Sequence, residues 1–322
     1  MQGKVVVGID GGGTQTSCTF RDMASATGKK RFHERDPVRV AGTNPTAVGL
    51  NEMRSRLRDL LRSGIQYYGV EPSNIAAVCA GIAGLRVEAV RQLAEQELAR
   101  IGAELGFGAT TSYTVTTDKH IALQGALHPG QRSGILVIAG TGSSALGIAK
   151  GKLYTCGGWG HKLGDEGSGY AIGMKALQAI CRAHDQRVAP TLLKGLVLEH
   201  LGLTEVDELI AYFHDSCPSK EEIAELSKLV VAAAQHSDAQ AAAILDQATD
   251  DLIDLVRGLS RQTSGFGLQP CVYGAGSIVN RVERVRTRFA SGLQREGLGI
   301  LTEPSGSALD GAVSLAWAST QS

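Results

Sequence analysis

The chain has 322 residues, and its 32 Lys and Arg balance 32 Asp and Glu, so its formal net charge at pH 7 is zero. This balance gives no electrostatic reason to expect a nucleic acid or an anionic membrane surface as the main partner. The length suffices for two domains of ordinary size and argues against a single small module. Glycine is the unusual residue, at 41 of 322, or about 13%, roughly twice average usage and without the period of collagen.

Neither targeting segments nor paired cysteines are evident in the sequence. No stretch approaches the roughly eighteen apolar residues of a membrane span, and the first residues lead into a short apolar run rather than a signal peptide. The six cysteines are far apart and form no C-x-x-C pair: Cys18, Cys79, Cys156, Cys181, Cys217 and Cys271. We therefore expect a cytoplasmic protein with reduced thiols, not a disulfide framework or a zinc site.

The first half of the chain alternates strand and helix patterns. Residues 4–10 form an apolar run that ends in a glycine cluster, and β-compatible residues resume at 17–21, which predicts two strands joined by a Gly-rich turn. Two amphipathic helices and two buried strands follow in alternation: residues 47–63 and 88–105, and residues 75–79 and 112–117. This order predicts an α/β domain with a largely parallel or mixed sheet.

The second half begins with the same plan and then becomes helical. Residues 133–149 again read as strand, Gly/Thr loop and strand, which suggests two similar halves. Helical patterns follow beyond residue 165: residues 169–184, 191–201, 206–214, 220–235 and 239–259. Strands return at 270–273 and 299–302, and an apolar helix at 307–318 closes the chain.

The first glycine loop, residues 10–16, has the composition of a phosphate-binding turn. Without side chains, Gly11, Gly12 and Gly13 let backbone N–H groups converge on a phosphate. The Thr14 hydroxyl adds a donor, and Asp10 at the strand end could hold a hydrated Mg²⁺. The pattern is neither a Walker motif nor G-x-G-x-x-G, and taken alone it is equally well explained as a structural hairpin loop.

Two later junctions have related chemistry. In residues 139–144, Thr141 and Gly142 could contact phosphate, although a plain turn explains this loop alone. In residues 272–277, the backbone at Gly274 and Gly276 would let adenosine lie close, while Ser277 is placed to cap a helix from residue 278. The two hairpin loops together are more informative, because a bound triphosphate needs donors on each side.

The segment 156–170 is the most specific stretch of the chain. Six glycines, two carboxylates and a Trp make it a poor strand and a poor helix, and ordering such a loop costs conformational entropy. Asp165 and Glu166 could accept hydrogen bonds from hydroxyls, and Trp159 could form an apolar wall. We therefore expect this loop to bind a ligand.

Asp118 follows the strand-like residues 113–117, where a catalytic carboxylate would lie at a sheet edge. Its alternative role is the N-cap of a helix from Lys119, and position alone does not choose between the two. His120 and His161 pair with no Cys or His at ligand spacing, so they read as ordinary polar residues.

Taken in order, these segments resemble the N-acetylglucosamine kinase family of the actin, sugar kinase and heat-shock ATPase superfamily. The resemblance covers nearly the whole chain: residues 8–16, 139–144, 157–169, 274–277 and 308–312. It implies two ribonuclease-H-like α/β domains, with ATP and sugar in the cleft between them and a helix-rich second domain. The implied domains are residues 1–117 with 303–322, and residues 118–302 with a helical insertion.

The resemblance also implies roles for individual residues. Asp118 looks like the general base that activates the sugar 6-hydroxyl towards the γ-phosphate, and Asn44 looks like a hydroxyl-binding residue. The sugar-contacting positions fall on Gly158, Trp159, Gly160 and Asp165, and the phosphate or substrate contacts fall on Thr14 and Thr141. ATP and Mg²⁺ are the implied cofactors, an amino sugar is the implied partner, and family members are commonly homodimers.

The chain departs from the family pattern at two places. Thr117 stands where the family often has Asn before the catalytic Asp, and Ala233 replaces a glycine that lies near the nucleotide in some relatives. The first bears on the support of Asp118, the second on the adenine side of the nucleotide site.

Two other functions share this scaffold. An activator ATPase of 2-hydroxyacyl-CoA dehydratases needs cysteines for an iron–sulfur cluster, which Cys156 and Cys181 do not recreate. A sugar-sensing regulator would need a DNA-binding extension, which we do not expect because Met1 lies only three residues before the first expected strand. The sequence leaves the sugar open among N-acetylglucosamine, glucosamine, N-acetylmannosamine and N-acetylmuramic acid.

Overall fold

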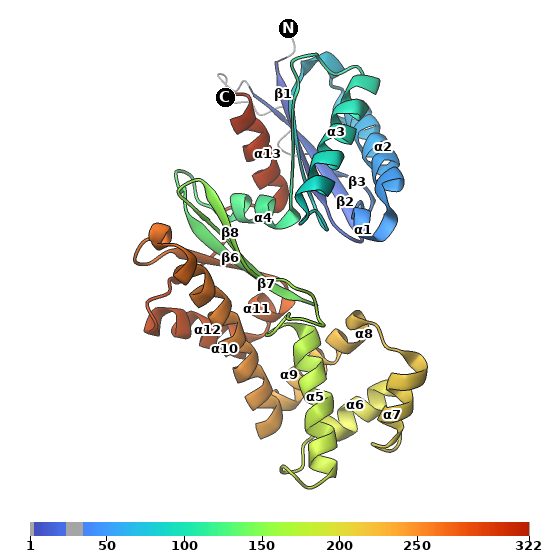
Figure 1. The fold of residues 1–322 in the computed structure, drawn as a ribbon, viewed down its shortest axis with the longest axis vertical. Coiled ribbons are helices and arrows are strands. Elements are labelled where there is room, and N and C mark those ends of the chain that lie inside the picture. The colour runs from blue at the N-terminus through green and yellow to red at the C-terminus, as the bar shows by residue number, and fades with distance from the viewer. Residues whose placement is uncertain (1–2, 24–34, 322) are drawn as a thin grey trace. The chain divides into compact units, whose positions relative to one another are not determined.

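In a computed structural model, the chain divides into two compact units, Met1–Gln131 with Pro304–Ser322, and Arg132–Glu303. The structure describes residues 3–23 and 35–321. Each unit contains one five-stranded sheet (Figure 1). The boundary lies at 131/132 rather than at the expected 117/118, because helix α4 (Asp118–Ala126) packs on helix α13 (Ala308–Ser319) of the first unit.

The sheet of unit 1 has the order β3-β2-β1-β4-β5. Its strands are β1 (Val5–Gly11), β2 (Gln15–Asp22), β3 (Val38–Ala41), β4 (Ile75–Ile82) and β5 (Ser112–Thr116). Strands β1, β2 and β3 are antiparallel neighbours, whereas β4 runs parallel to both β1 and β5. The carboxyl ends of β1, β4 and β5 therefore meet at one edge, which brings Asp10 and Asp118 to the same side of the unit.

Helices cover both faces of this sheet. Alternate residues of β1 point to opposite sides, so Val7 packs with helices α2 (Leu50–Tyr68) and α3 (Glu88–Glu104), while Val6 packs with α4 and α13. Burial on both faces explains why β1 reads as a continuous apolar run rather than an alternating one. The short helix α1 (Pro45–Val48) follows β3, a strand that the sequence did not predict.

Two glycines bring α4 and α13 into backbone contact. A Cβ atom on Gly125 would lie 1.9 Å from the carbonyl oxygen of Ser307, and one on Gly311 would lie 1.9 Å from that of Ile121. No larger residue fits at either place without moving a helix. Figure 1 shows the consequence, with α13 from the end of the chain lying beside α4 and β1. This packing fixes the start of α4, where Asp118 lies.

The sheet of unit 2 repeats the plan in the order β10-β9-β6-β7-β8. Its strands are β6 (Gly134–Ala139), β7 (Ser143–Ala149), β8 (Lys152–Gly157), β9 (Cys271–Ala275) and β10 (Ile300–Thr302). Strands β6, β7 and β8 are antiparallel neighbours, and β9 runs parallel to β6 and β10. Each unit thus has a hairpin, a third antiparallel strand and two parallel strands. The sequence suggested two similar halves, but it predicted neither of the third strands, β3 and β8.

Unit 2 is the helix-rich unit, as expected. Its helices are α5 (Gly169–His184), α6 (Leu193–Leu201), α7 (Glu208–Ala211), α8 (Lys220–Glu225), α9 (Ser227–Gln235), α10 (Ala239–Gln262), α11 (Ser277–Arg281) and α12 (Glu283–Arg295). The single helix predicted at 220–235 is divided at Leu226. Helix α12 was not predicted, yet its buried face follows helical spacing with Val285, Phe289 and Leu293. Across the described residues, none of the helices has the length and apolar character to cross a membrane.

Candidate active site

Asp118 occupies the first turn of α4, directly after β5. The N-cap is Thr117, whose Oγ1 accepts the N–H of His120 at 3.2 Å. The N-cap alternative for Asp118 is therefore wrong, because its neighbour fills that position. The carboxylate of Asp118 accepts the backbone N–H of Lys119 and lies near the charge of that lysine. Thr117, which stands where the family often has Asn, thus stabilises the start of α4 as its N-cap.

Asp10 and Asp118 form a pair of partly buried carboxyl groups at the edge of the sheet. Burial raises the pKa of both groups, and the charge of Asp118 raises the pKa of Asp10 further. His120 lies on the same turn, where burial lowers its pKa and its Nδ1 lies 2.8 Å from the hydroxyl of Thr116.

The residues that follow β3 hold the first glycine loop through backbone hydrogen bonds. The N–H of Gly42 donates to the carbonyl of Thr14 at 2.9 Å, and the N–H of Thr43 donates to that of Gly12 at 3.1 Å. A Cβ atom on Gly42 would lie 2.0 Å from the oxygen of Gly13. The N–H groups of Gly13 and Thr14 have no acceptor among the residues that the structure describes. These two donors are therefore available to an anion.

The other two predicted phosphate residues of this loop have structural contacts. The N–H of Gly12 donates to the carbonyl of Gln15 at 3.0 Å, and Gly11 belongs to strand β1. Its carbonyl accepts the N–H of Ala83 at 2.8 Å, and a Cβ atom would lie 2.7 Å from the Thr43 hydroxyl. Glycine is required here for close packing between β1 and the segment after β3.

Asn44 caps helix α1 beside the same edge. Its Oδ1 accepts the backbone N–H of Thr46 at 3.0 Å and the Thr46 hydroxyl at 2.7 Å. A Cβ atom on Gly84 would lie 2.2 Å from this Oδ1. With both acceptor sites of the oxygen used, Asn44 offers a ligand its amide NH₂ group as a donor.

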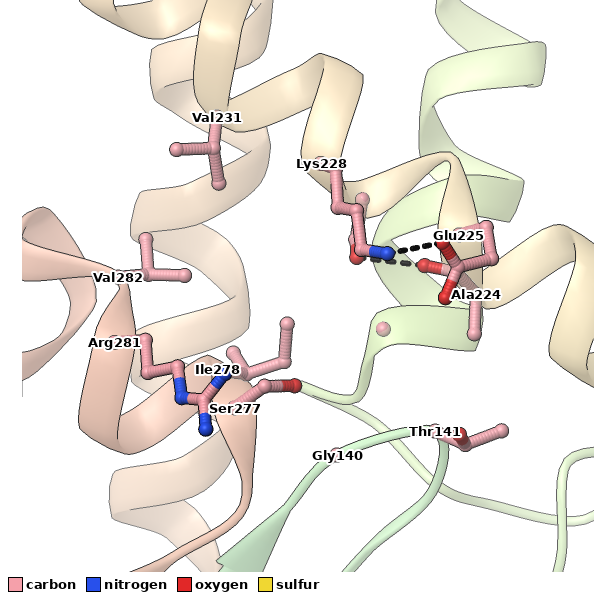
Figure 2. A pocket seen from close by; sticks show the side chains of 12 residues that line it. Gly140, Thr141, Ala224, Glu225, Lys228, Val231, Ser277, Ile278, Arg281 and Val282 are labelled. Carbon is pink, nitrogen blue, oxygen red and sulfur yellow. Dashed lines mark hydrogen bonds and ion pairs between the residues drawn. The ribbon is translucent and has the colours of Figure 1, made fainter.

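In unit 2, a cavity of about 270 Å³ opens beside the second glycine loop (Figure 2). Gly140, Thr141, Gly169, Ala224, Glu225, Ser227, Lys228, Val231, Ser277, Ile278, Arg281 and Val282 line it. Of the predicted nucleotide residues, Thr141 and Ser277 lie in this cavity. The N–H groups of Thr141 and Gly142 have no acceptor within the described part of the chain. Of the residues with these two N–H groups, Thr141 lines the cavity.

Ser277 does not cap α11, contrary to expectation. The helix begins at Ser277 itself, and the N-cap is Gly276, at a φ of +93°. A Cβ atom on Gly276 would lie 2.3 Å from the carbonyl oxygen of Ala139, so the turn requires glycine. Gly274 lies in β9, where its carbonyl accepts the side-chain amide of Asn280 at 3.1 Å. These glycines shape the turn beside the cavity and leave Ser277 facing it.

The walls of the cavity were not predicted from the sequence. Val231, Ile278 and Val282 are apolar, and Lys228 forms an ion pair with Glu225 (Figure 2). The lining residues recur every three or four positions along α8, α9 and α11, as helix faces do. This spacing predicts that the residues share one face of each helix. Nothing in the sequence distinguishes a helix face that lines a cavity from one that packs in the core.

The Gly-rich loop between β8 and α5 contains the predicted sugar-binding residues. Trp159 is 63% exposed and Asp165 is 7% exposed. The N–H of Gly158 donates to the carbonyl of Ser143 at 3.1 Å, and Gly160 adopts a φ of +86°. The loop therefore presents an exposed aromatic ring, while its carboxylate at Asp165 is buried against the second glycine loop.

Comparison with known proteins agrees with this geometry. The model of the BadF/BadG/BcrA/BcrD ATPase family matches residues 7–313. An N-acetylmuramic acid/N-acetylglucosamine kinase of Clostridium acetobutylicum is 31% identical over 287 residues, which is 89% of each chain. An N-acetyl-D-glucosamine kinase of Dictyostelium discoideum is 29% identical over 285 residues, which is 86% of each chain. The expected resemblance to N-acetylglucosamine kinases is confirmed.

A solved structure from Chromobacterium violaceum, a candidate N-acetylglucosamine kinase, has the same fold. It is 25% identical, with a TM-score of 0.69, and the match covers 98% of this chain and 99% of the other. The expected pair of actin-like α/β units is therefore confirmed. Because the family model spans most of its length, the chain belongs to the BadF/BadG/BcrA/BcrD ATPase family.

Proposed function

We propose that the protein is an ATP-dependent amino-sugar kinase that phosphorylates the 6-hydroxyl of N-acetylglucosamine or glucosamine, with Asp118 as the general base. The observation that carries this proposal is the carboxylate of Asp118. It lies at the carboxyl end of a parallel strand, and its neighbour Thr117 caps the helix in its place. The similarity to sugar kinases over most of the chain supports the reaction class.

The chemistry asks little of the protein beyond positioning and charge stabilisation, because phosphoryl transfer has a loose transition state. Asp118 would accept the proton of the sugar hydroxyl as that oxygen attacks the γ-phosphoryl group. Burial raises the pKa of Asp118, which makes its carboxylate a stronger base than an exposed one. Unit 1 would thus supply the group that activates the acceptor.

The cavity of unit 2 has the features expected of a nucleotide site. The N–H groups of Thr141 and Gly142 would donate to phosphate oxygens, and the side chains of Val231, Ile278 and Val282 would contact the adenine ring. Ser277 would offer a hydroxyl to the ribose or phosphate. Apolar walls with a few polar groups at one end are typical of sites for small ligands.

The carboxylates of unit 1 also fit a magnesium ion. Asp10 and Asp118 are partly buried oxygen ligands whose mutual repulsion a divalent cation would relieve. Mg²⁺ retains several waters and needs only one or two protein carboxylates, so Asp10 suffices to hold it. When bound, the ion would neutralise charge on the transferring phosphates.

The acceptor would be recognised by groups from the exposed loop and from α1. Asn44 would donate its amide NH₂ to a sugar hydroxyl, Trp159 would contact the ring or the acyl group, and Gly158 and Gly160 would let the sugar approach the backbone. Polar recognition of this kind rejects sugars that lack the matching hydroxyls, because buried partners would stay unpaired.

The decisive experiment assays the purified chain with Mg·ATP against N-acetylglucosamine, glucosamine, N-acetylmannosamine, glucose and N-acetylmuramic acid. We expect turnover of at least one of the first two, and a loss of about 10²–10⁴-fold in kcat for Asp118→Asn. Asp250→Asn is a matched control, since this carboxylate pairs with Arg288 at 2.8 Å in an exposed ion pair. Asp118→Asn activity within a few-fold of wild type would refute Asp118 as the base.

The same preparation tests the main alternative. An iron-containing brown protein that hydrolyses ATP and phosphorylates no sugar would identify an activator ATPase instead. Quantifying iron in the purified chain, beside the sugar panel, separates the two functions.

A further inference from the structure

The Gly-rich loop is fastened to the second glycine loop by a series of hydrogen bonds. Ser143 lies at the centre: its N–H donates to Oδ1 of Asp165 at 3.3 Å, and its hydroxyl donates to the carbonyl of Glu166 at 2.6 Å. At the start of α5, the N–H of Gly169 donates to the carbonyl of Gly140 at 2.7 Å. The two loops therefore form one hydrogen-bonded assembly.

The carboxylate of Asp165 lies beside the backbone of Gly142 in the second glycine loop. A Cβ atom on Gly142 would lie 2.8 Å from Oδ2 of Asp165, so only glycine leaves room for this carboxylate. Gly142 and Thr141 carry the two N–H groups that have no acceptor among the described residues. The side chain that the sequence assigned to sugar thus contacts the backbone from which those donors project.

The backbone of Asp165 indicates that this arrangement is strongly held. Its φ is +64°, a left-handed conformation that side chains with a Cβ rarely adopt, Asn and Asp being the best tolerated. Its carbonyl accepts the N–H of Ser168 at 3.2 Å, and its side chain is 7% exposed. Such conformations persist only where the surrounding contacts determine them, and they cluster at functional sites.

We propose that Asp165, together with the backbone of Glu166, is a positioning residue for the nucleotide: it fixes the second glycine loop so that the N–H groups of Thr141 and Gly142 face the phosphates. This inference rests on the proposed kinase function. It assigns to the Gly-rich loop a part in nucleotide affinity that is separate from any contact with sugar.

Two variants at this position separate the hydrogen bond from the charge. Asp165→Asn keeps an oxygen acceptor for the N–H of Ser143 and tolerates the left-handed backbone. Asp165→Gly removes the acceptor, while glycine adopts a φ of +64° without strain. Neither variant forces the backbone to move, so both are expected to fold. Asp250→Asn again serves as the control for loss of a carboxylate elsewhere in unit 2.

The measurement is the Kd of a non-hydrolysable ATP analogue by calorimetry, with Mg²⁺ and without sugar. We expect Asp165→Gly to bind about fivefold or more weakly, and Asp165→Asn to stay within about twofold of wild type. In steady-state assays, the KM for ATP should rise in Asp165→Gly and not in Asp165→Asn. A residue that only contacts sugar would leave the Kd unchanged in both variants, and that result would overturn the assignment.

Equal weakening in both variants would also overturn it, because the charge and not the hydrogen bond would then matter. If Asp165→Gly does not fold, Ser143→Ala decides, since it removes the hydroxyl bond to Glu166 and should weaken the analogue about two- to fivefold. An unchanged Kd in Ser143→Ala would refute the fastening role. The binding test needs no turnover, so it stays informative even if the sugar panel shows no kinase activity.

Discussion

The two glycine loops, one in the hairpin of each unit, have similar backbone hydrogen bonding but different side chains around them. In each unit, the residue after the third strand donates its backbone N–H to the hairpin. In unit 1, Gly42 donates to the carbonyl of Thr14, and in unit 2, Gly158 donates to the carbonyl of Ser143. Each loop keeps two N–H donors without an acceptor among the described residues. However, Asp10 is the last but one residue of the first strand in one hairpin, whereas Ile138 has that position in the other.

This difference indicates a division of labour between two similar units. Under the proposed function, the carboxylates of Asp10 and Asp118 would give unit 1 the groups that hold a cation and activate an acceptor. In unit 2, β6 ends without a carboxylate, and Glu303, which follows β10, forms an ion pair with Arg286. A cavity and a helix start lie beside the loop of this unit instead. A repeated fold can therefore carry two different half-sites, with the side chains at the strand ends deciding which.

The largest effect should come from Asp118→Asn, which removes the acid–base group from unit 1. We expect kcat to fall about 10²–10⁴-fold in a coupled ATP assay. At neutral pH the melting temperature should rise by about 2 °C, because the buried charge and its repulsion of Asp10 disappear. A variant that lost both activity and stability would show that Asp118 is a structural residue.

The next largest effect should come from glycines that the loops require. A Cβ atom would lie 2.0 Å from a carbonyl oxygen at Gly42 and 2.3 Å at Gly276, but would meet nothing within 4 Å at Gly13 and Gly140. We expect Gly42→Ala and Gly276→Ala to cost about 2 kcal/mol each in the free energy of unfolding. Gly13→Ala and Gly140→Ala should stay within about 0.5 kcal/mol. Denaturant unfolding measures all four, and equal effects would contradict the packing described here.

A smaller effect should appear in the pH dependence. Because burial raises the pKa of Asp118 above its ordinary value of 3.8, kcat/KM should decline on acidification at a higher pH than for an exposed carboxylate. The sign for stability is opposite: the raised pKa destabilises the fold above that pKa, and the penalty is relieved as the pH falls through it. The stability gained by Asp118→Asn should therefore shrink on acidification. A gain that grows in acid would refute the shift.

The smallest effects should come from the helix caps. Thr117 caps α4 in unit 1, and Ser168 caps α5 in unit 2 by accepting the N–H of Ala171 at 3.2 Å. Replacing either residue by Ala should cost about 1 kcal/mol in the free energy of unfolding, and Thr117→Ser should recover most of it. Destabilisation by Thr117→Ser as large as by Thr117→Ala would exclude a capping role.

The hairpins, most helices and the placement of Asp118 could be predicted from the sequence, because they follow from local periodicity and from glycine clusters. The domain boundary could not, since it depends on a contact between Gly125 and Ser307, far apart in the chain. Helix α12 was missed because its few apolar residues are dispersed among arginines that pair with acids of α10, such as Arg284 with Asp246.

The candidate site, like the fold, has residues that the sequence could predict and residues that it could not. Residues at strand ends and in glycine loops were identified because their position follows from the order of the elements. The role of Asp165 in holding Ser143 depends on how two loops meet, and the cavity residues Glu225 and Lys228 lie on helices whose orientation is set by packing. Such features arise from tertiary contacts that local patterns do not encode.

The return of α13 to the first unit has a consequence for synthesis on the ribosome. Domains usually fold in the order in which they emerge. Here unit 2 is complete before α13 is made, so the face of the first sheet that packs on α13 lacks this partner until α13 leaves the ribosome. The unit that begins first is completed after the second unit, and helix α4, which carries Asp118, gains its packing partner only when α13 has been made.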